Sequence, residues 1–520
     1  MSSNLFNELK KYGESDFYPF HMPGHKRNLD CDFFSEIYKI DITEIDGFDN
    51  LHQAEGIIKK AQEKAALLYH SKETFYLING STAGILTAVS ALADRGKKLI
   101  LARNCHKAVY HGVFLNHLEA EYIYPKMIDE FGISDGITAE QVDNKIQEIL
   151  LEEKISDEKA GELIAGIVVT SPSYDGILSD VRGIAKIAHS YGIPVIIDQA
   201  HGAHFGFHDA FPENAVTEGA DLVIHSTHKT LPAPTQTALL HCNSSLVSLE
   251  TVKKYLRIYQ SSSPSYVLMA GIDSCMDFVK KEGKERLEQL LLFRKELIEG
   301  TKGLNKIRIY QSMAERGVKG QEISRSYLPE MEEPGRLLIS VRGTGYTGQQ
   351  MYDVLRENYH LQMEMCASDY VIAILSMMDR KEGFDRLRKA LSETDRLLSD
   401  RDKKKEEKTG FSEYCHYQPE IVLKISDAFM ADEESVLLYE AKGRIASEFV
   451  NLYPPGIPLL VPGERIDDKI ISMLETYLDN GYAVQGIERA ETKDRHYYLK
   501  VIYERKNKNK QQYESEVNSL

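Results

Sequence analysis

The sequence DLVIHSTHKT occupies residues 221–230 and joins a short apolar run to a cluster of polar side chains. The apolar run is rich in β-branched residues and is typical of a buried strand. Lys229 therefore follows the tip of that strand, where burial lowers the pKa of an amine and prepares it to form a Schiff base. Most lysines are instead solvent-exposed surface residues, so Lys229 alone identifies no function.

Four other runs of the same kind precede this one, and helical patterns separate them. The five predicted strands are residues 74–78, 98–102, 164–170, 194–198 and 221–225. Amphipathic segments such as 81–93 and 180–191 lie between them. This alternation predicts an α/β fold in which a mostly parallel sheet is covered by helices on both faces.

The remaining sequence predicts further helices and a second, smaller α/β region. Residues 55–70 are expected to form a helix with Ile57, Ala61, Ala65 and Leu68 on its apolar face. The other expected helices are 266–300, 347–358 and 381–398, and the small region has expected strands at 336–341 and 370–375.

The expected domain bounds follow from these patterns. In chain order they are an N-terminal segment 1–50, a large α/β domain 51–300, a small α/β domain 301–400, a linker 401–420, a C-terminal α+β domain 421–505 and a frayed tail 506–520.

The segment NGSTAG, residues 79–84, follows the first predicted strand and opens a helix. Backbone N–H groups at a helix N-terminus attract a dianion, and nearby hydroxyls add donors. Ser81, Thr82 and Ala83 are therefore predicted phosphate contacts. An ordinary Ser/Thr helix cap is the simpler interpretation of this segment taken alone.

Two further strand tips carry side chains suited to a cofactor. Asp198 ends the predicted strand 194–198, at the edge where parallel sheets bind ligands. A buried carboxylate needs a cationic or donating partner, which a pyridinium N–H would provide; a helix cap or a salt bridge would also explain it. His106 follows the strand 98–102 and is interpreted either as a ring that stacks on a flat cofactor or as a structural histidine.

These features converge on one edge of one sheet. A phosphate cradle, a stacking ring, a partner for a pyridine nitrogen and an activated lysine are what pyridoxal phosphate (PLP) requires of a protein. Ser226 and His228 are placed to add donors to the phosphate. The sequence therefore predicts PLP as the cofactor.

The composition excludes other classes of protein. The formal net charge is −16, from 63 basic and 79 acidic residues, which argues against nucleic acid as a partner. No segment reaches the roughly 18 uninterrupted apolar residues of a membrane-spanning helix, and the N-terminus shows no secretory signal. The six cysteines are scattered without a CxxC pair, so we expect no metal site and a reducing, cytoplasmic environment.

At these residues the chain resembles the Orn/Lys/Arg decarboxylases, a PLP-dependent family with the type I, aspartate-aminotransferase-like fold. The segments that carry the resemblance are FHMPGHK (20–26), DITE (41–44), DNLH (49–52), DQAHGAHF (198–205), STHKT (226–230), QSSSPSY (260–266), YPPGIP (453–458) and VPGE (461–464). The last two distinguish the family from ordinary type I aminotransferases. The resemblance implies a seven-stranded type of sheet and a homodimer at least, with active sites shared between subunits.

The family's roles carry over position by position. Lys229 resembles the lysine that holds the cofactor, Asp198 the partner of the pyridine nitrogen and His106 the stacking group. His201 would lie near the phenolic oxygen of the cofactor or the substrate carboxylate. The side chains that resemble phosphate ligands are Ser81, Thr82, Ser226 and His228.

The implied reaction is decarboxylation of a basic amino acid to agmatine or a diamine plus CO₂, as in polyamine biosynthesis, with arginine favoured before lysine and ornithine. Transamination, elimination or PLP binding without turnover are the alternatives. An acidic group should read the substrate side chain, and the candidates are Glu464, Glu44 and Asp46, each of which could equally be an ordinary surface or capping carboxylate. Arg342 is expected to meet a carboxylate, either of the substrate or in a structural salt bridge.

The chain departs from the family pattern in two respects. Gln199 stands beside Asp198 where the family usually has Glu, which leaves the charge near the cofactor open. The chain also resembles the shorter form of the family, which lacks the receiver-like N-terminal domain of the acid-inducible members.

Overall fold

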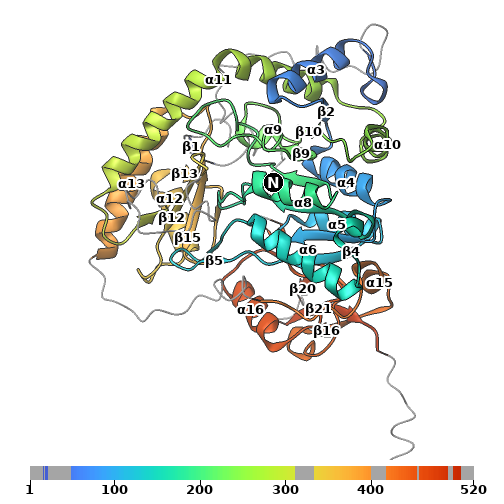
Figure 1. Cartoon of the computed structure of the whole chain (residues 1–520). Coiled ribbons are helices and arrows are strands. Elements are labelled where there is room, and N and C mark those ends of the chain that lie inside the picture. The colour runs from blue at the N-terminus through green and yellow to red at the C-terminus, as the bar shows by residue number, and fades with distance from the viewer. Residues whose placement is uncertain are drawn as a thin grey trace, which may run out of the picture. The chain divides into compact units, whose positions relative to one another are not determined.

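The computed structural model describes residue 16 and residues 18–20, 49–310, 333–399, 417–453, 456–489 and 496–504. The chain divides into two compact units, Met1–His416 and Tyr417–Leu520. Each unit is described by itself below, and Figure 1 labels the elements of both.

A seven-stranded sheet forms the centre of the first unit (Figure 1). In spatial order its strands are β2 (Glu73–Leu77), β10 (Ala238–Cys242), β9 (Leu222–His225), β8 (Val195–Asp198), β7 (Ile164–Thr170), β3 (Lys98–Ala102) and β4 (Glu119–Ile123). β10 runs antiparallel to both of its neighbours, and the other strands share one direction. The carboxyl ends of β2, β9, β8, β7 and β3 therefore meet at one edge, where such sheets bind ligands.

Helices cover this sheet, as the sequence predicts. They are α3 (Ile57–Tyr69), α4 (Gly80–Leu92), α5 (Lys107–Leu115), α6 (Ala139–Glu153), α8 (Val181–Ser190) and α10 (Leu249–Tyr259), with the short turns η1 (Leu51–Gln53), η2 (Asp157–Lys159), α7 (Ala160–Leu163) and α9 (Thr227–Thr230) and the hairpin β5 (Met127–Ile128) and β6 (Ile133–Ser134). α4 packs on α5 and α10, and α6 packs on α8. The mostly parallel α/β architecture is confirmed.

The five predicted strands correspond to β2, β3, β7, β8 and β9, each within one residue at either end. The sequence patterns did not predict β4 and β10. β4 alternates charged and apolar residues and is only half-buried over its first part, so it lacks the continuous apolar run of an interior parallel strand.

The predicted apolar face of α3 is partly wrong. Ile57 is 58% exposed, whereas the neighbouring Ile58 is 5% exposed and belongs to the core. The buried stripe runs through Gln62, whose side-chain oxygen accepts a hydrogen bond from the backbone N–H of Tyr76 at 2.9 Å. A buried glutamine within the stripe concealed the true face of the helix.

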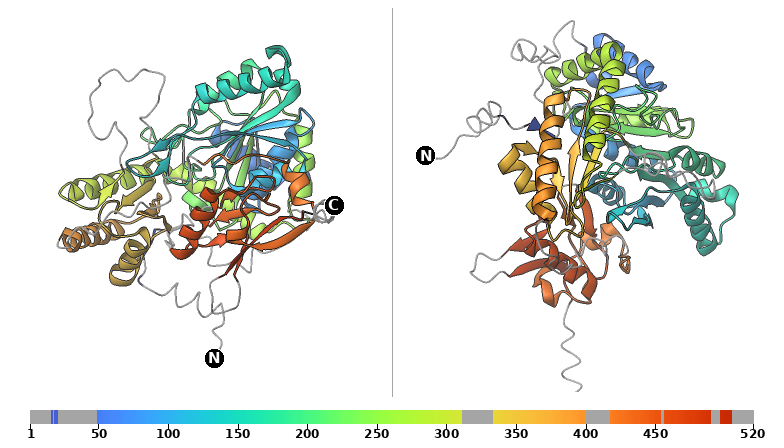
Figure 2. Two further views of the ribbon diagram at one scale, coloured as in Figure 1. Left: turned by 90° about the horizontal axis from the view of Figure 1, so that it is seen from below. Right: turned by 90° about the vertical axis from the view of Figure 1, so that its left-hand side faces the viewer.

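A smaller sheet of four strands lies beside the large one in the first unit. Its order is β11 (Arg308–Ile309), β12 (Arg336–Ser340), β15 (Tyr370–Ile374) and β14 (Met365–Cys366). The helices α12 (Gly348–Tyr359) and α13 (Lys381–Ser399) belong to this region, and β1 (Tyr18–Pro19) pairs with β13 (Leu361–Gln362). The long helix α11 (Tyr266–Thr301) connects the two regions and packs along α13, as both views of Figure 2 show.

The second unit contains two small antiparallel sheets. One has the order β16 (Glu433–Leu437), β21 (Tyr497–Ile502) and β20 (Ile487–Arg489), and the other β18 (Ile457–Leu460), β17 (Val450–Leu452) and β19 (Val484–Gln485). The helices are α15 (Ile425–Phe429), the turn η3 (Leu438–Glu440) and α16 (Asp468–Asp479). Across the described residues of both units, no helix has the length and apolarity to cross a membrane.

Close packing of α4 on the sheet depends on Gly84. A Cβ atom at this position would lie 2.6 Å from Cδ1 of Leu77 and 3.3 Å from Cγ2 of Ile224. We therefore expect Gly84→Val to lower the free energy of unfolding by about 1–3 kcal/mol, the usual cost of overpacking. Urea unfolding monitored by circular dichroism measures this loss. Gly303→Ala is the control, because a Cβ there meets no atom within 4 Å, and an equal loss in both variants would contradict the expectation.

Candidate active site

Lys229 lies in the short helix α9, directly after β9. Its Nζ atom is 2.9 Å from Nε2 of His201. Burial lowers the pKa of Lys229 to about 8, against the opposing charges of Asp198 and Glu364, and the charge of Arg336 acts in the same direction as burial. The amine is therefore partly uncharged near neutral pH, as a nucleophilic lysine must be.

Asp198 ends β8, the strand next to β9, and is 3% exposed. Its Oδ1 atom accepts a hydrogen bond from the backbone N–H of Ala200 at 3.1 Å. Among the described residues, this is the single hydrogen bond to the carboxylate. Burial raises the pKa of Asp198, while the charge of Lys229 and the hydrogen bond from Ala200 act against it. The carboxylate and the amine therefore share one electrostatic environment, and the carboxylate has lone pairs left to accept from a further donor.

His201 lies in the loop that follows Asp198 and is 5% exposed. Its ring packs edge-on against Tyr174, with the centroids 4.9 Å apart and an interplanar angle of 69°. Nδ1 of the same ring is hydrogen-bonded to the guanidinium of Arg336. Burial, together with the charges of Lys229 and Arg336, holds the pKa of His201 well below its ordinary value, so the ring is neutral.

His106 follows β3 and caps α5, because its Nδ1 atom accepts a hydrogen bond from the backbone N–H of Ala108 at 3.2 Å. Burial lowers the pKa of His106 to about 3, and the charge of Lys229 contributes. A neutral ring near Lys229 suits stacking on an aromatic group, since it places no positive charge against a protonated pyridine.

The N-terminus of α4 is available to an anion. Asn79 occupies the N-cap position, but its side chain does not cap the helix and instead accepts a hydrogen bond from the backbone N–H of Ser261 at 3.0 Å. In the first turn Ser81 is half-buried, Thr82 is exposed and Ala83 is buried.

Two residues after β9 complete the predicted phosphate end. Oγ of Ser226 is buried and has no hydrogen-bond partner among the described residues. Nδ1 of His228 donates to the carbonyl oxygen of Thr237 at 2.9 Å, and burial lowers the pKa of this ring to about 4. In the neutral form Nε2 carries a lone pair, so His228 can donate to a phosphate only when the phosphate's own charge draws a proton onto the ring.

These features fit pyridoxal phosphate. A buried hydroxyl without a partner and a helix N-terminus without a side-chain cap suit the phosphate. A buried carboxylate with one backbone hydrogen bond suits a pyridinium N–H, and a partly neutral lysine suits an aldehyde. The described residues contain no group of three or more His, Cys, Asp or Glu side chains arranged to hold a metal ion.

Within the described part of the first unit, Arg342 is not among the groups that act on the charge of Lys229. Nε of Arg342 lies 3.5 Å from Oδ2 of Asp369, within the small region. Glu464 belongs to the second unit, where its buried carboxylate accepts a hydrogen bond from the backbone N–H of Val461 at 2.8 Å. Glu44 and Asp46 lie outside the described residues. These four assignments stay predictions.

Sequence reasoning missed three residues that surround His201 and Lys229. Arg336 begins β12 of the small sheet, Glu364 follows β13, and Tyr174 follows β7 with its hydroxyl donating to Glu364. The position of Tyr174, just beyond a parallel strand, was a usable signal. A charged residue at the start of the apolar run 336–341 was a weaker one.

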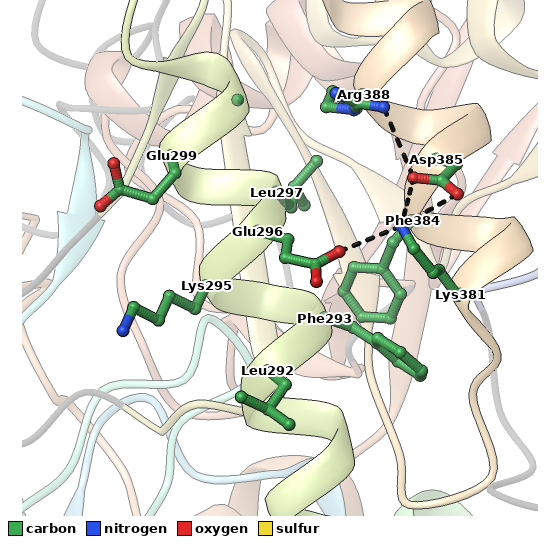
Figure 3. Close-up of a pocket in the computed structure, with 11 residues that line it drawn as sticks. Leu292, Phe293, Lys295, Glu296, Leu297, Glu299, Lys381, Phe384, Asp385 and Arg388 are labelled. Carbon is green, nitrogen blue, oxygen red and sulfur yellow. Dashed lines mark hydrogen bonds and ion pairs between the residues drawn. The ribbon is translucent and has the colours of Figure 1, made fainter.

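A separate groove lies between α11 and α13 (Figure 3). Leu297 and Phe384 line it, and Lys381 makes ion pairs with Glu296 at 3.0 Å and Asp385 at 2.8 Å. Hydrogen bonds with Asp385 and Glu296 raise the pKa of Lys381, which keeps this exposed amine charged and therefore a poor nucleophile.

A mostly parallel sheet with a buried lysine, a carboxylate and a neutral imidazole beyond the ends of β9, β8 and β3 is typical of type I PLP-dependent enzymes. Comparison with protein families gives the narrower assignment. The Orn/Lys/Arg decarboxylase major domain matches residues 3–382, and the C-terminal domain of the same family matches residues 408–503. The chain belongs to the Orn/Lys/Arg decarboxylase family and is a PLP-dependent carboxy-lyase by that membership.

Relatives along the whole chain agree with this assignment. The arginine decarboxylase of Bacillus subtilis (strain 168) is 33% identical over 517 residues, which cover 96% of this chain and 98% of that protein. The arginine decarboxylase of Bacillus anthracis is 30% identical over 491 residues, covering 93% of this chain and 94% of that protein.

Solved structures share the fold. The lysine decarboxylase of Francisella novicida superposes with a TM-score of 0.73 at 21% identity, covering 96% of this chain and 80% of that one. The constitutive lysine decarboxylase of E. coli gives a TM-score of 0.72 at 18% identity, covering 96% and 81%. At this level of identity the likeness concerns the fold alone.

The electrostatic pairing of Asp198 with Lys229 predicts a shift in amine reactivity. Only the uncharged amine reacts with an acylating reagent, so the labelling rate rises with pH through the pKa of Lys229, which is about 8. Asp198→Asn removes a charge that favours the ammonium, so the midpoint should move about one unit lower. Mass spectrometry of the peptide containing Lys229, in full-length protein freed of cofactor, measures it. Glu63→Gln, on the exposed surface of α3, should leave the midpoint unchanged; a midpoint that stays at 8 or rises in Asp198→Asn would contradict the pairing.

Proposed function

We propose that this protein uses pyridoxal phosphate, held covalently by Lys229, to decarboxylate a basic L-amino acid. Arginine is the favoured substrate, followed by lysine and ornithine, and the products are CO₂ and agmatine or a diamine. The observation that carries the proposal is the amine of Lys229, with a pKa lowered to about 8, in the same buried environment as the carboxylate of Asp198.

The chain's own residues would hold the cofactor at both ends. The buried hydroxyl of Ser226 and the first turn of α4, with Ser81, Thr82 and Ala83, would bind the phosphate. The carboxylate of Asp198 would hold the proton on the pyridine nitrogen, because a neighbouring negative charge favours the protonated form. The bound cofactor supplies an electron sink for the bond that breaks as CO₂ leaves.

The remaining groups would position the reacting bond and move a proton. The neutral ring of His106 would lie against the cofactor ring and exclude water from one side. Orientation of the substrate carboxylate out of the ring plane selects decarboxylation over the other type I reactions. Lys229 or His201, whose side-chain nitrogens lie 2.9 Å apart, would deliver the proton that replaces the carboxylate at the α-carbon.

The preference for arginine rests on the two relatives named as arginine decarboxylases, each matched over more than nine-tenths of its length. Glu464, Glu44 and Arg342 remain the candidates for substrate contacts. A cytoplasmic homodimer with active sites shared between its subunits, following the family resemblance, completes the proposal.

Parallel assays with L-arginine, L-lysine and L-ornithine test the reaction. We expect CO₂ release with arginine at a kcat/KM at least about tenfold above that with the other two, a difference of about 1.4 kcal/mol in transition-state binding. Release of an oxo acid or ammonia without CO₂ would instead identify another type I reaction and refute the proposal.

Lys229→Ala should abolish both CO₂ release and the visible absorbance of the bound cofactor, because no amine remains to hold it. Lys295→Ala is the matched control, since Lys295 is an exposed lysine of α11 among the residues that line the separate groove of Figure 3. It should retain both signals. If the absorbance survives in Lys229→Ala, another lysine carries the cofactor.

A further inference from the structure

Arg336 reaches the active-site edge from the small sheet. It begins β12, is 1% exposed, and its guanidinium is hydrogen-bonded to Nδ1 of His201. The turn at Gly176 makes room for it: this glycine has φ +91°, and a Cβ there would lie 2.6 Å from Cβ of Arg336. The large and small sheets thus meet at the contact between Arg336 and His201, and His201 in turn lies against Lys229.

A guanidinium is a donor only, so the hydrogen bond from Arg336 requires a lone pair on Nδ1 of His201. A neutral imidazole then carries its proton on Nε2, the atom that lies 2.9 Å from Nζ of Lys229. This N–H can donate to an uncharged amine, which has a lone pair. It cannot pair with an ammonium, because two donors would then face each other.

We propose that Arg336 is a positioning residue that fixes the tautomer of His201 and thereby favours the uncharged, nucleophilic form of Lys229. The inference rests on the proposed function for the use of a nucleophilic Lys229, whereas the contacts among Arg336, His201 and Lys229 do not depend on the reaction.

The charge of Arg336 is compensated within the same cluster. Its Nη1 atom lies 3.3 Å from Oε2 of Glu333, a residue with no exposed surface. The other oxygen of Glu333 lies 2.9 Å from Nε2 of His204 and accepts a hydrogen bond from the N–H of Gly335 at 2.5 Å. Burial acts to raise the pKa of Glu333, but His204 and Arg336 hold it below its ordinary value. Glu333 thus balances the charge of Arg336, and the hydrogen bond to His201 serves to orient the imidazole.

The amine of Lys229 responds to groups on several elements. Asp198 and Glu364 favour its charged form, and Arg336 and burial disfavour it. The titratable and charged groups that face it are Asp198, Glu364, Arg336, His106, His201 and His228. Among these groups, Arg336 is the one that is always a donor and that contacts His201, whose ring touches the amine of Lys229.

The test uses a variant that removes the guanidinium without leaving an unpaired buried charge. Arg336→Met combined with Glu333→Gln removes both charges and keeps acceptors for His204 and Gly335. Nitrogen-15 NMR of histidine-labelled full-length protein, stripped of cofactor, reads the tautomer of His201, and His201→Gln identifies its signal. Arg336→Lys is the conservative variant, because an ammonium still donates to Nδ1.

We expect the Nε2–H tautomer in the wild-type chain and in Arg336→Lys, and the Nδ1–H tautomer in the double variant. The midpoint of Lys229 acylation should rise by at least about one pH unit in the double variant, which slows labelling at pH 7 about tenfold. A wild-type His201 with its proton on Nδ1, or a double variant with unchanged tautomer and midpoint, overturns the inference. The first of these outcomes needs no change at Arg336 or Glu333, only the His201→Gln variant that identifies the signal.

The outcome is separable from that of the proposed reaction. If the tautomer and the acylation midpoint change as expected but the wild-type enzyme releases no CO₂ from any basic amino acid, the inference stands and the reaction is refuted. If the wild-type enzyme decarboxylates arginine but the double variant keeps the Nε2–H tautomer, the reaction stands and the inference falls.

Discussion

Burial opposes the charge of the amine of Lys229, and the neighbouring side chains set how far that opposition goes. Desolvation acting alone would hold a buried lysine neutral over most of the physiological pH range. The charges of Asp198 and Glu364 stabilise the ammonium and raise the pKa of Lys229, whereas the charge of Arg336 lowers it. The resulting pKa of about 8 leaves an amine that can attack as a base and can still carry a proton. Such a group needs acids and bases held at fixed positions around it, which loops alone would not provide.

The sheet supplies those positions through strand adjacency. β8 and β9 are parallel neighbours, and Asp198 pairs with Ile224, two residues before Ser226. Adjacent strands lie about 4.8 Å apart, so residues just beyond their ends are brought together whatever the intervening loop and helix do. β7 and β3 extend the same edge and contribute Tyr174 and His106. The antiparallel β10 begins at this edge instead of ending there. Thr237, the residue before it, contacts Thr227 and His228.

This dependence explains which parts of the site could be predicted from sequence. Lys229, Asp198 and His106 each follow an apolar run with polar residues at its end, so a local pattern identified them, and the parallel arrangement brought them together. Arg336 has no such pattern: it starts a strand of a different sheet, and its role depends on how the two sheets pack. The predicted buried face of α3 was partly wrong for a related reason. Gln62 is buried and accepts a hydrogen bond from Tyr76, which helical periodicity alone does not predict.

Gln199, the residue after Asp198, contacts a different set of groups from Asp198. Oε1 of Gln199 accepts hydrogen bonds from the N–H of Ala215 at 2.9 Å and from Nε2 of His225 at 2.8 Å. Nδ1 of His225 must then accept from Nε2 of His241, 3.0 Å away, and burial holds the pKa of both rings far below the ordinary value. An amide oxygen satisfies these donors without adding charge, whereas a carboxylate at the same place would draw a second proton onto His225. The departure from the family's usual Glu therefore bears on the protonation of a buried histidine pair, while Asp198, one residue earlier, faces Lys229.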